Sequence, residues 1–300
     1  MSGTVFLVNP ASGNGSTGKR WPKLELRAAE LGLTGDVVFS ERRGQLIELA
    51  RQAAETHDLL VVVGGDGTLN EVVNGIAGSN AEIAVLPAGT GQDFGRTYGI
   101  PPAFDDAVRI ALEGTPRTID LGRVTYQGRE GKEAERYFAN VGSVGMSGVV
   151  AERANSMSKA LGGKATFFYA LVRVFAVWKN TEVTVTLDDD ERHGRMHDVI
   201  VANGQWHGGG MKLAPGASPD DGLFDVVLIG DVTKLDFVTT APKLYKGNHV
   251  THPRIEVLKS SRVTVEAPVP LPIEVEGEPI GTTRAAFEIV PGALRVRVPA

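Results

Sequence analysis

The sequence predicts an α/β domain with a parallel sheet, followed by a β-rich domain built as a two-sheet sandwich. From residue 5 to residue 112, short apolar segments typical of strands alternate with segments of helical periodicity, the order expected of a parallel sheet with helices on both faces. After Pro116, short segments of alternating apolar residues dominate instead. We therefore predict two domains, residues 1–116 and 117–300, with a last strand that can return to the first domain.

Length, charge and composition narrow the class of protein. Three hundred residues suit two domains that each bury a core. The formal net charge of −5 argues against a general nucleic-acid-binding protein, which would carry a basic excess. The absence of cysteine removes disulfides, thiolate nucleophiles and cysteine metal sites, and is compatible with a reducing cytoplasm.

The sequence shows no signal peptide and no membrane-spanning segment. The residues MSGTVFLVNPASGNG lack the basic region and the long apolar region of a signal peptide. No apolar run approaches the roughly 18 residues that a membrane helix needs. We therefore expect a cytoplasmic protein whose membrane contact is peripheral.

A glycine-rich turn after the third strand is the first candidate site. The run Val61–Val63 suits a buried strand, and the glycines that follow let the backbone approach a bound group closely. A helical pattern then begins at Thr68, so free backbone N–H groups and the helix dipole favour a phosphate there. A plain strand-to-helix turn with a solvent-facing aspartate is the alternative. The polar residues that favour a site are Asp66, Thr68, Asn70 and Glu71.

Two other predicted strands end in comparable loops. The first strand ends at Asn9, and its polar loop runs on to Lys19 and Arg20; this loop is either a phosphate site or a surface linker. The fourth strand is followed by a loop with Thr90 and Asp93. Because ligands of parallel α/β sheets bind at the carboxyl ends of the strands, these loops and the glycine-rich turn are expected to converge.

Ser40 ends the second predicted strand and has two interpretations. It is either a further nucleotide contact at the same sheet edge or the cap of the helix that begins near Arg43.

A helical segment, residues 146–179, interrupts the β-rich domain. Its apolar stripe is expected to be a core face, made of Phe167, Phe168, Leu171, Phe175 and Trp178. Residues 151–179 also carry five basic residues against Glu152 alone. This asymmetry suits a surface that approaches anionic lipid. We hypothesise that the segment helps to admit a lipid substrate, with Lys159 and Lys164 among its basic residues.

Two acidic constellations follow. His207 has no partner at ligand spacing and is interpreted as loop packing, whereas Asp220 and Asp221 next to Gly222 are either metal ligands or an Asp-Gly turn. Glu276 and Glu278 are expected on one strand face around Gly277, where a carboxylate can accept a proton from a hydroxyl; an exposed acidic hairpin is the alternative.

Five motifs, in order, resemble those of the diacylglycerol kinase and sphingosine kinase superfamily. They are NPASG, GGDGTLNEV, GTGQDF, APGASPDDGLFD and EGE. Within the superfamily, the chain is most similar to the soluble bacterial lipid kinases, so the resemblance implies an N-terminal domain of the NAD kinase and diacylglycerol kinase type. The chain departs from the family pattern at Gln92, where asparagine is usual, and at Glu276, where aspartate is usual.

The resemblance also implies roles for individual residues. ATP would contact the residues Asn9, Ser40, Gly64, Gly65, Asp66, Gly67, Thr68, Leu69, Asn70 and Thr90. Mg²⁺ would be bound by Asp221 and by the carbonyls of Ser218 and Leu223. Glu276 would be the catalytic base, with Glu278 beside it, and Asp66 would position the metal or the nucleotide.

The resulting prediction is an ATP- and Mg²⁺-dependent kinase that phosphorylates a lipid hydroxyl at a membrane surface. An NAD kinase-like enzyme and a non-catalytic nucleotide-binding regulatory protein are the alternatives. No nucleic-acid partner is expected, and potential edge strands in the β-rich domain are compatible with a homodimer.

Overall fold

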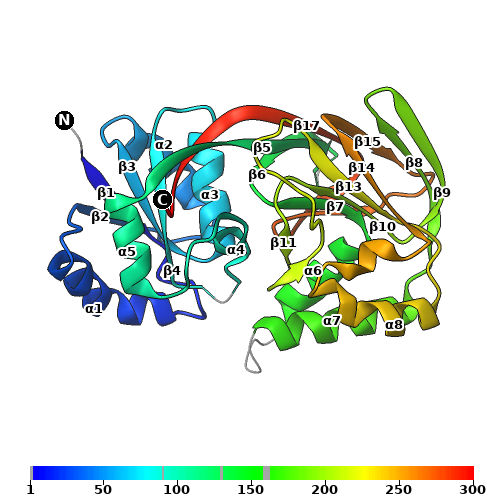
Figure 1. The fold of residues 1–300 in the computed structure, drawn as a ribbon, viewed down its shortest axis with the longest axis horizontal. Helices are drawn as coiled ribbons and strands as arrows, with labels where there is room; N and C mark the ends of the chain where they lie inside the picture. The colour runs from blue at the N-terminus through cyan, green and yellow to red at the C-terminus, as the bar shows by residue number, and fades with distance from the viewer. Residues whose placement is uncertain (1–2, 90, 129–130, 158–162) are drawn as a thin grey trace. The chain divides into compact units, whose positions relative to one another are not determined.

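The computed structural model describes residues 3–89, 91–128, 131–157 and 163–300. The chain forms two compact units: unit 1 comprises Met1–Leu121 and Pro291–Ala300, and unit 2 comprises Gly122–Val290. Two long strands, β5 (Thr115–Gln127) and β17 (Glu278–Val298), each run from one unit into the other (Figure 1). The predicted boundary at residues 116 and 117 falls within β5.

Unit 1 contains a parallel sheet. Its strands are β1 (Thr4–Val8), β2 (Asp36–Phe39), β3 (Leu59–Gly64) and β4 (Glu82–Pro87), which pair in the order β4-β3-β1-β2. The end of β17 pairs with β4, also in parallel, with Arg295 opposite Glu82. The β-branched and leucine-rich composition of β3 fits a strand whose six residues are all buried.

Helices cover both faces of this sheet. Alternate residues such as Phe6 and Val61 face a core shared with α1 (Ser16–Glu30) and α5 (Phe104–Glu113). The intervening positions are also buried, and α2 (Gln45–Ala54) and α3 (Asp66–Ile76) pack together and contact β3. A short helix, α4 (Asp93–Tyr98), follows β4.

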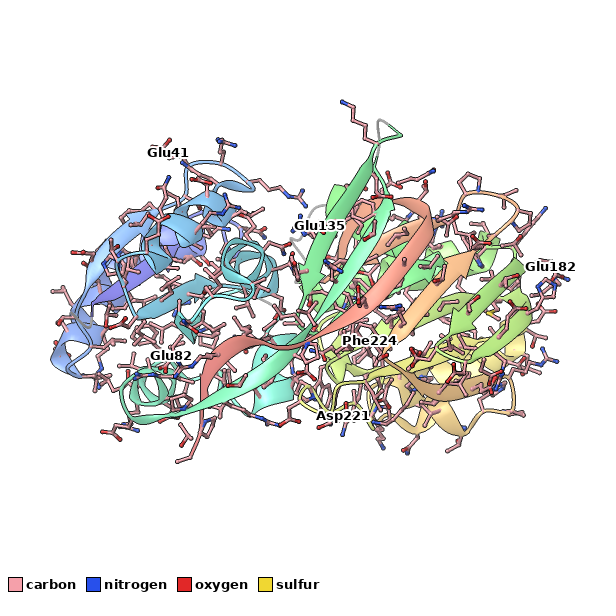
Figure 2. The ribbon with its side chains drawn as sticks, turned by 90° about the horizontal axis from the view of Figure 1, so that it is seen from above. Glu41, Glu82, Glu135, Glu182, Asp221 and Phe224 are labelled. Carbon is pink, nitrogen blue, oxygen red and sulfur yellow. The ribbon has the colours of Figure 1, made fainter. Side chains whose placement is uncertain are left out.

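Unit 2 is β-rich, as predicted. One group of antiparallel strands is ordered β14-β13-β10-β7-β16, and a second group contains β5, β6, β8, β9, β15 and part of β17. Phe224, labelled in Figure 2, is fully buried between the groups and stacks on Phe138. The bounds are β6 (Glu133–Phe138), β7 (Val141–Gly145), β8 (Thr181–Leu187), β9 (Asp190–Met196), β10 (Asp198–Ala202), β13 (Phe224–Ile229), β14 (Ile255–Ser260), β15 (Arg262–Glu266) and β16 (Pro272–Val275).

A helical layer packs on the outer face of the first strand group. It contains α6 (Met146–Ser156), α7 (Gly163–Val177) and α8 (Lys234–Leu244). These helices share an apolar core with strand residues such as Ile200 and Val227. Shorter elements are β11 (Trp206–His207), β12 (Met211–Lys212) and the 3-10 helix Asn248–Thr251.

The helical interpretation of residues 146–179 is confirmed by α6 and α7. Leu171 and Phe175 of the predicted stripe are buried, but Phe168 is 42% exposed, so its assignment to the core was wrong. The predicted elements did not include α8, the polar strand β9 or the short elements β11, β12 and the 3-10 helix. A capping box in which Thr233 and Asp236 bond reciprocally was the sequence signal for α8. Among the described residues, no helix has the length and apolar character to span a membrane.

Candidate functional site

Three loops meet at the carboxyl ends of the strands of unit 1. The side-chain amide of Asn9 donates to Thr68 Oγ1 at 3.0 Å, which joins the loop after β1 to the start of α3. Gly65 and Gly89 lie so close that a Cβ on Gly89 would be 2.4 Å from Gly65 Cα. The predicted convergence of these loops is therefore confirmed. We call residues 9–15, 64–68, 88–89 and 91–93 the loop edge.

Asp66 ties two of these loops together. Its carboxylate accepts from the backbone N–H of Asp93 at 3.2 Å and of Phe94 at 3.1 Å, at the start of α4. Asp93 in turn forms a partly buried ion pair with Arg96 at 2.7 Å. The Asp66 carboxylate therefore links the start of α3 to the loop after β4. This structural role is separate from the predicted role of Asp66 in positioning a nucleotide.

The loop edge offers backbone donors to an anion. These donors lie at the start of α3, which has no side-chain hydrogen bond at its N-cap. The first N–H groups of α1, from Ser16 to Gly18, instead donate to carbonyls of the loop after β1. Gly65, Asp66 and Gly67 are partly exposed, while Thr68, Leu69 and Asn70 are buried. Predicted ATP contacts at Leu69 and Asn70 therefore involve the backbone or buried side chains. Thr90, also predicted to bind ATP, lies outside the described residues.

Glu71 and Ser40 have structural surroundings that the sequence did not indicate. The buried Glu71 carboxylate accepts from the backbone N–H groups of Gly44 at 2.8 Å and Leu46 at 3.2 Å, at the start of α2. Because α2 begins at Gln45 with Gly44 as its N-cap, the interpretation of Ser40 as a helix cap was wrong. Ser40 is buried at the end of β2, and its role in binding a nucleotide stays a prediction.

The proposed metal ligands lie in the loop before β13. Figure 2 labels Asp221, which is exposed at the margin of unit 2. Its Oδ1 accepts from Leu223 N at 3.1 Å, and its Oδ2 lies 2.6 Å from Lys259 Nζ. The same ammonium lies 3.3 Å from the buried Asp225 carboxylate. A lysine therefore neutralises the carboxylate that Mg²⁺ would need, so the residues as arranged do not fit a divalent cation.

Glu276 and Glu278 are arranged differently from the prediction. β16 ends at Val275, which pairs with Glu278, so Glu276 and Gly277 form the two-residue turn of a hairpin. Both turn residues have positive φ, 51° and 78°, as a type I′ turn requires. The expectation of two carboxylates on one strand face was wrong because the strand stops before Glu276. The hairpin is partly buried, so the exposed-hairpin alternative was also wrong.

The Glu276 carboxylate is nevertheless held in place. Its Oε1 accepts from the backbone N–H of Ala139 at 2.9 Å and of Asn140 at 2.7 Å. Glu278 instead pairs with Arg136 at 3.4 Å. Backbone donors therefore hold the Glu276 carboxylate, as they hold that of Asp66.

An apolar pocket lies beneath the helical layer of unit 2. Its cavity volume is about 100 Å³. The apolar wall includes Val150 of α6, Leu171 and Phe175 of α7, and Phe237 and Leu244 of α8. The apolar wall of this pocket suits a hydrocarbon chain.

A buried polar cluster interrupts this wall. It comprises Ser143, Ser147, Asp198, His207 and Glu274. Glu274 Oε1 lies 2.5 Å from Ser143 Oγ and 3.2 Å from His207 Nε2. Ser143 Oγ lies 2.6 Å from Ser147 Oγ, which lies 2.9 Å from Asp198 Oδ1. The interpretation of His207 as loop packing therefore missed a buried ion pair.

The protons of the cluster can be counted. Three oxygen–oxygen contacts link Glu274, Ser143, Ser147 and Asp198, but the two serines supply only two hydroxyl protons. Burial, with the nearby Glu274 charge, raises the pKa of Asp198 well above its ordinary value, which favours Asp198 over Glu274 as the source of a third proton. Burial opposes ionisation of Glu274 as well, but His207, Ser143 and Gly277 N–H hold its pKa below the ordinary value.

Sequence reasoning missed most of this cluster. Ser143, Asp198 and Glu274 lie on β7, β10 and β16, and residue spacing along the chain does not bring them together. Glu274 had one signal: it occupies the strand position between Ile273 and Val275, facing away from their core.

The surface of the helical layer also carries apolar and basic side chains. Phe168, Tyr169 and Val177 of α7 and Leu235 and Val238 of α8 are exposed. Three basic residues of this segment are also exposed: Arg153 on α6, Arg173 on α7 and Lys179 just after α7. Lys159 lies outside the described residues, as does the side chain of Lys164.

Comparisons with known proteins agree with both halves of the chain. The model of the diacylglycerol kinase catalytic domain matches residues 3–124, and that of the YegS C-terminal NAD kinase beta sandwich-like domain matches residues 140–298. The diacylglycerol kinase of Staphylococcus carnosus is 28% identical over 94% of this chain and 90% of its own length. The diacylglycerol kinase of Mycobacterium tuberculosis is 28% identical over 98% of this chain and 94% of its own length.

Solved structures share the fold. A crystal structure of a Bacillus anthracis diacylglycerol kinase superposes with a TM-score of 0.73 and 18% identity, over 99% of this chain and 97% of that one. Yeast NADH kinase in complex with NADH superposes with a TM-score of 0.57 and 13% identity, over all of this chain and 84% of that one. Because the two domain models together match most of its length, in the order of the motifs in its sequence, the chain belongs to the diacylglycerol kinase and sphingosine kinase superfamily, among its members of bacterial diacylglycerol kinase type.

Proposed function

We propose that the protein is an ATP-dependent lipid kinase that transfers the γ-phosphoryl group of ATP to the hydroxyl of a diacylglycerol-like or sphingoid lipid. Relatives that share nearly its whole length are named diacylglycerol kinases. The observation that carries the proposal is the apolar pocket of unit 2, in which the polar cluster provides hydrogen-bonding groups within an otherwise apolar wall. This combination suits a molecule with a long hydrocarbon chain and a small polar head.

The chemistry assigns a separate task to each unit. The backbone N–H groups of the loop edge bind the phosphates of ATP, and Mg²⁺ bound to ATP offsets their charge. Glu276 accepts the proton of the lipid hydroxyl while the hydroxyl oxygen forms a bond to the γ-phosphorus. The bond between the γ-phosphorus and the bridging oxygen breaks, and its electron pair leaves with ADP.

The outer surface of α7 and α8 is proposed to contact the membrane that holds the lipid. Exposed apolar side chains next to basic ones are typical of a peripheral membrane surface. Replacing Val177 and Leu235 together by aspartate should reduce binding to vesicles that contain anionic lipid by ~10-fold or more. Leu26→Asp, at a 68% exposed position on α1, is the control. Equal vesicle binding by all three proteins would contradict the membrane assignment.

The direct test is transfer of labelled phosphate from γ-labelled ATP to a lipid panel in mixed micelles, with Mg²⁺, for the wild type and Glu276→Gln. We expect a labelled lipid with the wild type and a loss of ~100-fold or more with the variant, because general-base catalysis typically contributes that much. ATP binding without transfer to any acceptor would instead favour a regulatory protein that has lost catalysis.

An NAD kinase-like activity is the second candidate. It is supported by the fold shared with yeast NADH kinase. The apolar wall of the pocket favours a lipid over the ribose hydroxyl of a dinucleotide. NAD is therefore included in the acceptor panel, and phosphorylated NAD as the only product would replace the lipid-kinase proposal.

A further inference from the structure

The turn that carries Glu276 is held from two sides through its neighbour, Gly277. The Gly277 N–H donates to Glu274 Oε2 at 2.7 Å, and the Gly277 carbonyl accepts from the side-chain amide of Asn155 at 3.0 Å. Glu274 belongs to the pocket wall, and Asn155 lies near the end of α6, the helix that also contributes Val150 to that wall. We call Glu274 and Asn155 the Gly277 clamp.

The backbone at this turn needs such support. Glu276 has a φ of 51°, in the left-handed region that a residue with a Cβ adopts at a cost of about 1 kcal/mol or more. Without the clamp, the turn could relax toward more favourable backbone angles and move the Glu276 carboxylate. Displacements of about 1 Å in a catalytic group can cost ~100-fold in rate.

Glu274 is in turn fixed by the rest of the polar cluster. Its other oxygen, Oε1, is in contact with both Ser143 and His207, so the carboxylate has partners on each side and little freedom to rotate. Because Glu274 is 1% exposed, its hydrogen bond to Gly277 is shielded from competing water. The same side chain thus belongs to the wall of the lipid pocket and sets the position of the catalytic turn.

We propose that Glu274 and Asn155 are positioning residues that fix the Glu276–Gly277 turn for proton transfer from the acceptor lipid. This inference rests on the proposed function, because it takes Glu276 as the base. The clamp residues themselves transfer no proton. The clamp acts on the step that Glu276 performs. Asn155 is not among the residues that line the pocket, so its loss should leave the binding of ATP and lipid unchanged.

Kinetics of clamp variants test the inference. We expect Asn155→Ala to lower kcat by ~10-fold, with the KM values for ATP and lipid within about twofold of wild type. Glu274→Ala should lower kcat by ~100-fold and, because Glu274 also lines the pocket, raise the KM for lipid as well. Glu274→Gln should stay within ~10-fold of wild type, because the glutamine amide can still accept from Gly277 N–H and donate to Ser143. A loss of ~100-fold or more in a folded Glu274→Gln protein would show that Glu274 is itself the base and would overturn the proposal.

A background variant separates positioning from a general structural effect. In Glu276→Gln protein, adding Asn155→Ala should cost no more than about twofold in residual kcat, since the group being positioned is already inactive. A full further loss of ~10-fold would contradict the clamp. Asn180→Ala and Glu266→Gln are matched controls, since each removes a polar contact elsewhere in unit 2.

Amide exchange keeps the test independent of catalysis and of the folding of Glu274→Ala. We expect the Gly277 amide to be protected in the wild type and to exchange at least ~10-fold faster in Asn155→Ala, which alters an exposed side chain. Unchanged exchange would overturn the clamp. If no lipid is phosphorylated while exchange responds as expected, the proposed function fails and the clamp stands as a device that fixes Glu276.

Discussion

The loop edge of unit 1 and the polar cluster of unit 2 use polar side chains in opposite ways. At the loop edge, Asp66 and Asn9 hydrogen-bond to neighbouring loops, and the donors available to a ligand are backbone N–H groups. In unit 2, Ser143, Asp198 and Glu274 line the pocket themselves, and their charges and protons define what it can bind.

This difference teaches how each site tolerates change. A site made of backbone depends on glycines and on close approach between loops, so added volume should be more harmful than lost charge. A site made of buried side chains depends on a complete set of hydrogen bonds and protons, so small chemical changes should matter there. The predictions below test this contrast, from the largest expected effect to the smallest.

Gly89→Val should have the largest effect. Its Cβ would lie 2.4 Å from Gly65 Cα and 2.9 Å from Gly65 N, so the two loops must separate. We expect ATP turnover to fall by ~100-fold or more. Gly32→Asn is the control, because a Cβ there meets nothing within 4 Å and asparagine tolerates its φ of 96° better than most residues. Wild-type ATP affinity and turnover in Gly89→Val would show that close approach of the loops is not required.

Ala241→Trp should affect the pocket alone. Ala241 is buried on α8 in the pocket wall, and an indole there would displace part of a bound hydrocarbon chain. Exclusion of two methylene groups costs about 1.6 kcal/mol, so the KM for a long-chain lipid should rise by ~10-fold while that for ATP is unchanged. Ala29→Trp adds the same volume at an exposed position on α1 as the control. An unchanged lipid KM in a folded Ala241→Trp protein would place the lipid elsewhere.

As the pH falls, unit 2 should lose folding stability before unit 1 does. Burial lowers the pKa of both His197 and His249 from 6.5 to about 4 in the folded protein, and both lie in unit 2. The unfolded chain therefore binds more protons as the pH falls from 6.5 toward 4, and folding loses ~3 kcal/mol per histidine across that window. Hydrogen exchange followed by mass spectrometry can measure each unit separately, and His197→Leu should remove part of the loss. Parallel loss of protection in both units would contradict this prediction.

The smallest effect in the series is expected when Mg²⁺ is offered to the Asp221 loop. Because the Lys259 ammonium already pairs with Asp221 and also contacts Asp225, millimolar Mg²⁺ without nucleotide should change the Tm of the wild type by less than about 1 °C. Lys259→Met leaves the buried Asp225 without its counter-charge, so its Tm should fall and Mg²⁺ should restore part of the loss. An increase of several degrees in the wild type would show that Mg²⁺ displaces Lys259, as the predicted metal site at Ser218, Asp221 and Leu223 requires.

Much of unit 1 was predictable from sequence because its signals are local. The run Val61–Val63, the glycines after it and the helical periodicity from Leu69 onward lie within one short segment, and parallel pairing then brings the strand ends together. The sequence did not predict two contacts between elements. The Glu71 carboxylate accepts from the start of α2 and the Asp66 carboxylate accepts from the start of α4, and no pattern in the neighbouring residues indicates either contact.

The site in unit 2 was much less predictable. The pattern of alternating apolar residues predicted a continuous strand through Glu276, but Glu276 and Gly277 form a turn. Such alternation does not by itself show where a strand ends. His207 was not predicted to be a site residue because it has no partner nearby in the sequence. It pairs with Glu274, which lies 67 positions further along the chain. The capping box of α8 was a local signal that could have located the third helix of the pocket.

The sequence by itself determined the α/β and β-rich halves, the family motifs and the glycine loops at the strand ends. These features follow from the periodicity of apolar residues and from the backbone freedom of glycine, which act over a few residues. Only the tertiary structure decided that Glu274 meets His207, Ser143 and Gly277, and that Lys259 occupies the Asp221 carboxylate. Such contacts depend on strand order and register, which bring distant residues together and bury them, so the charge and proton of each group are set by neighbours far away in the chain.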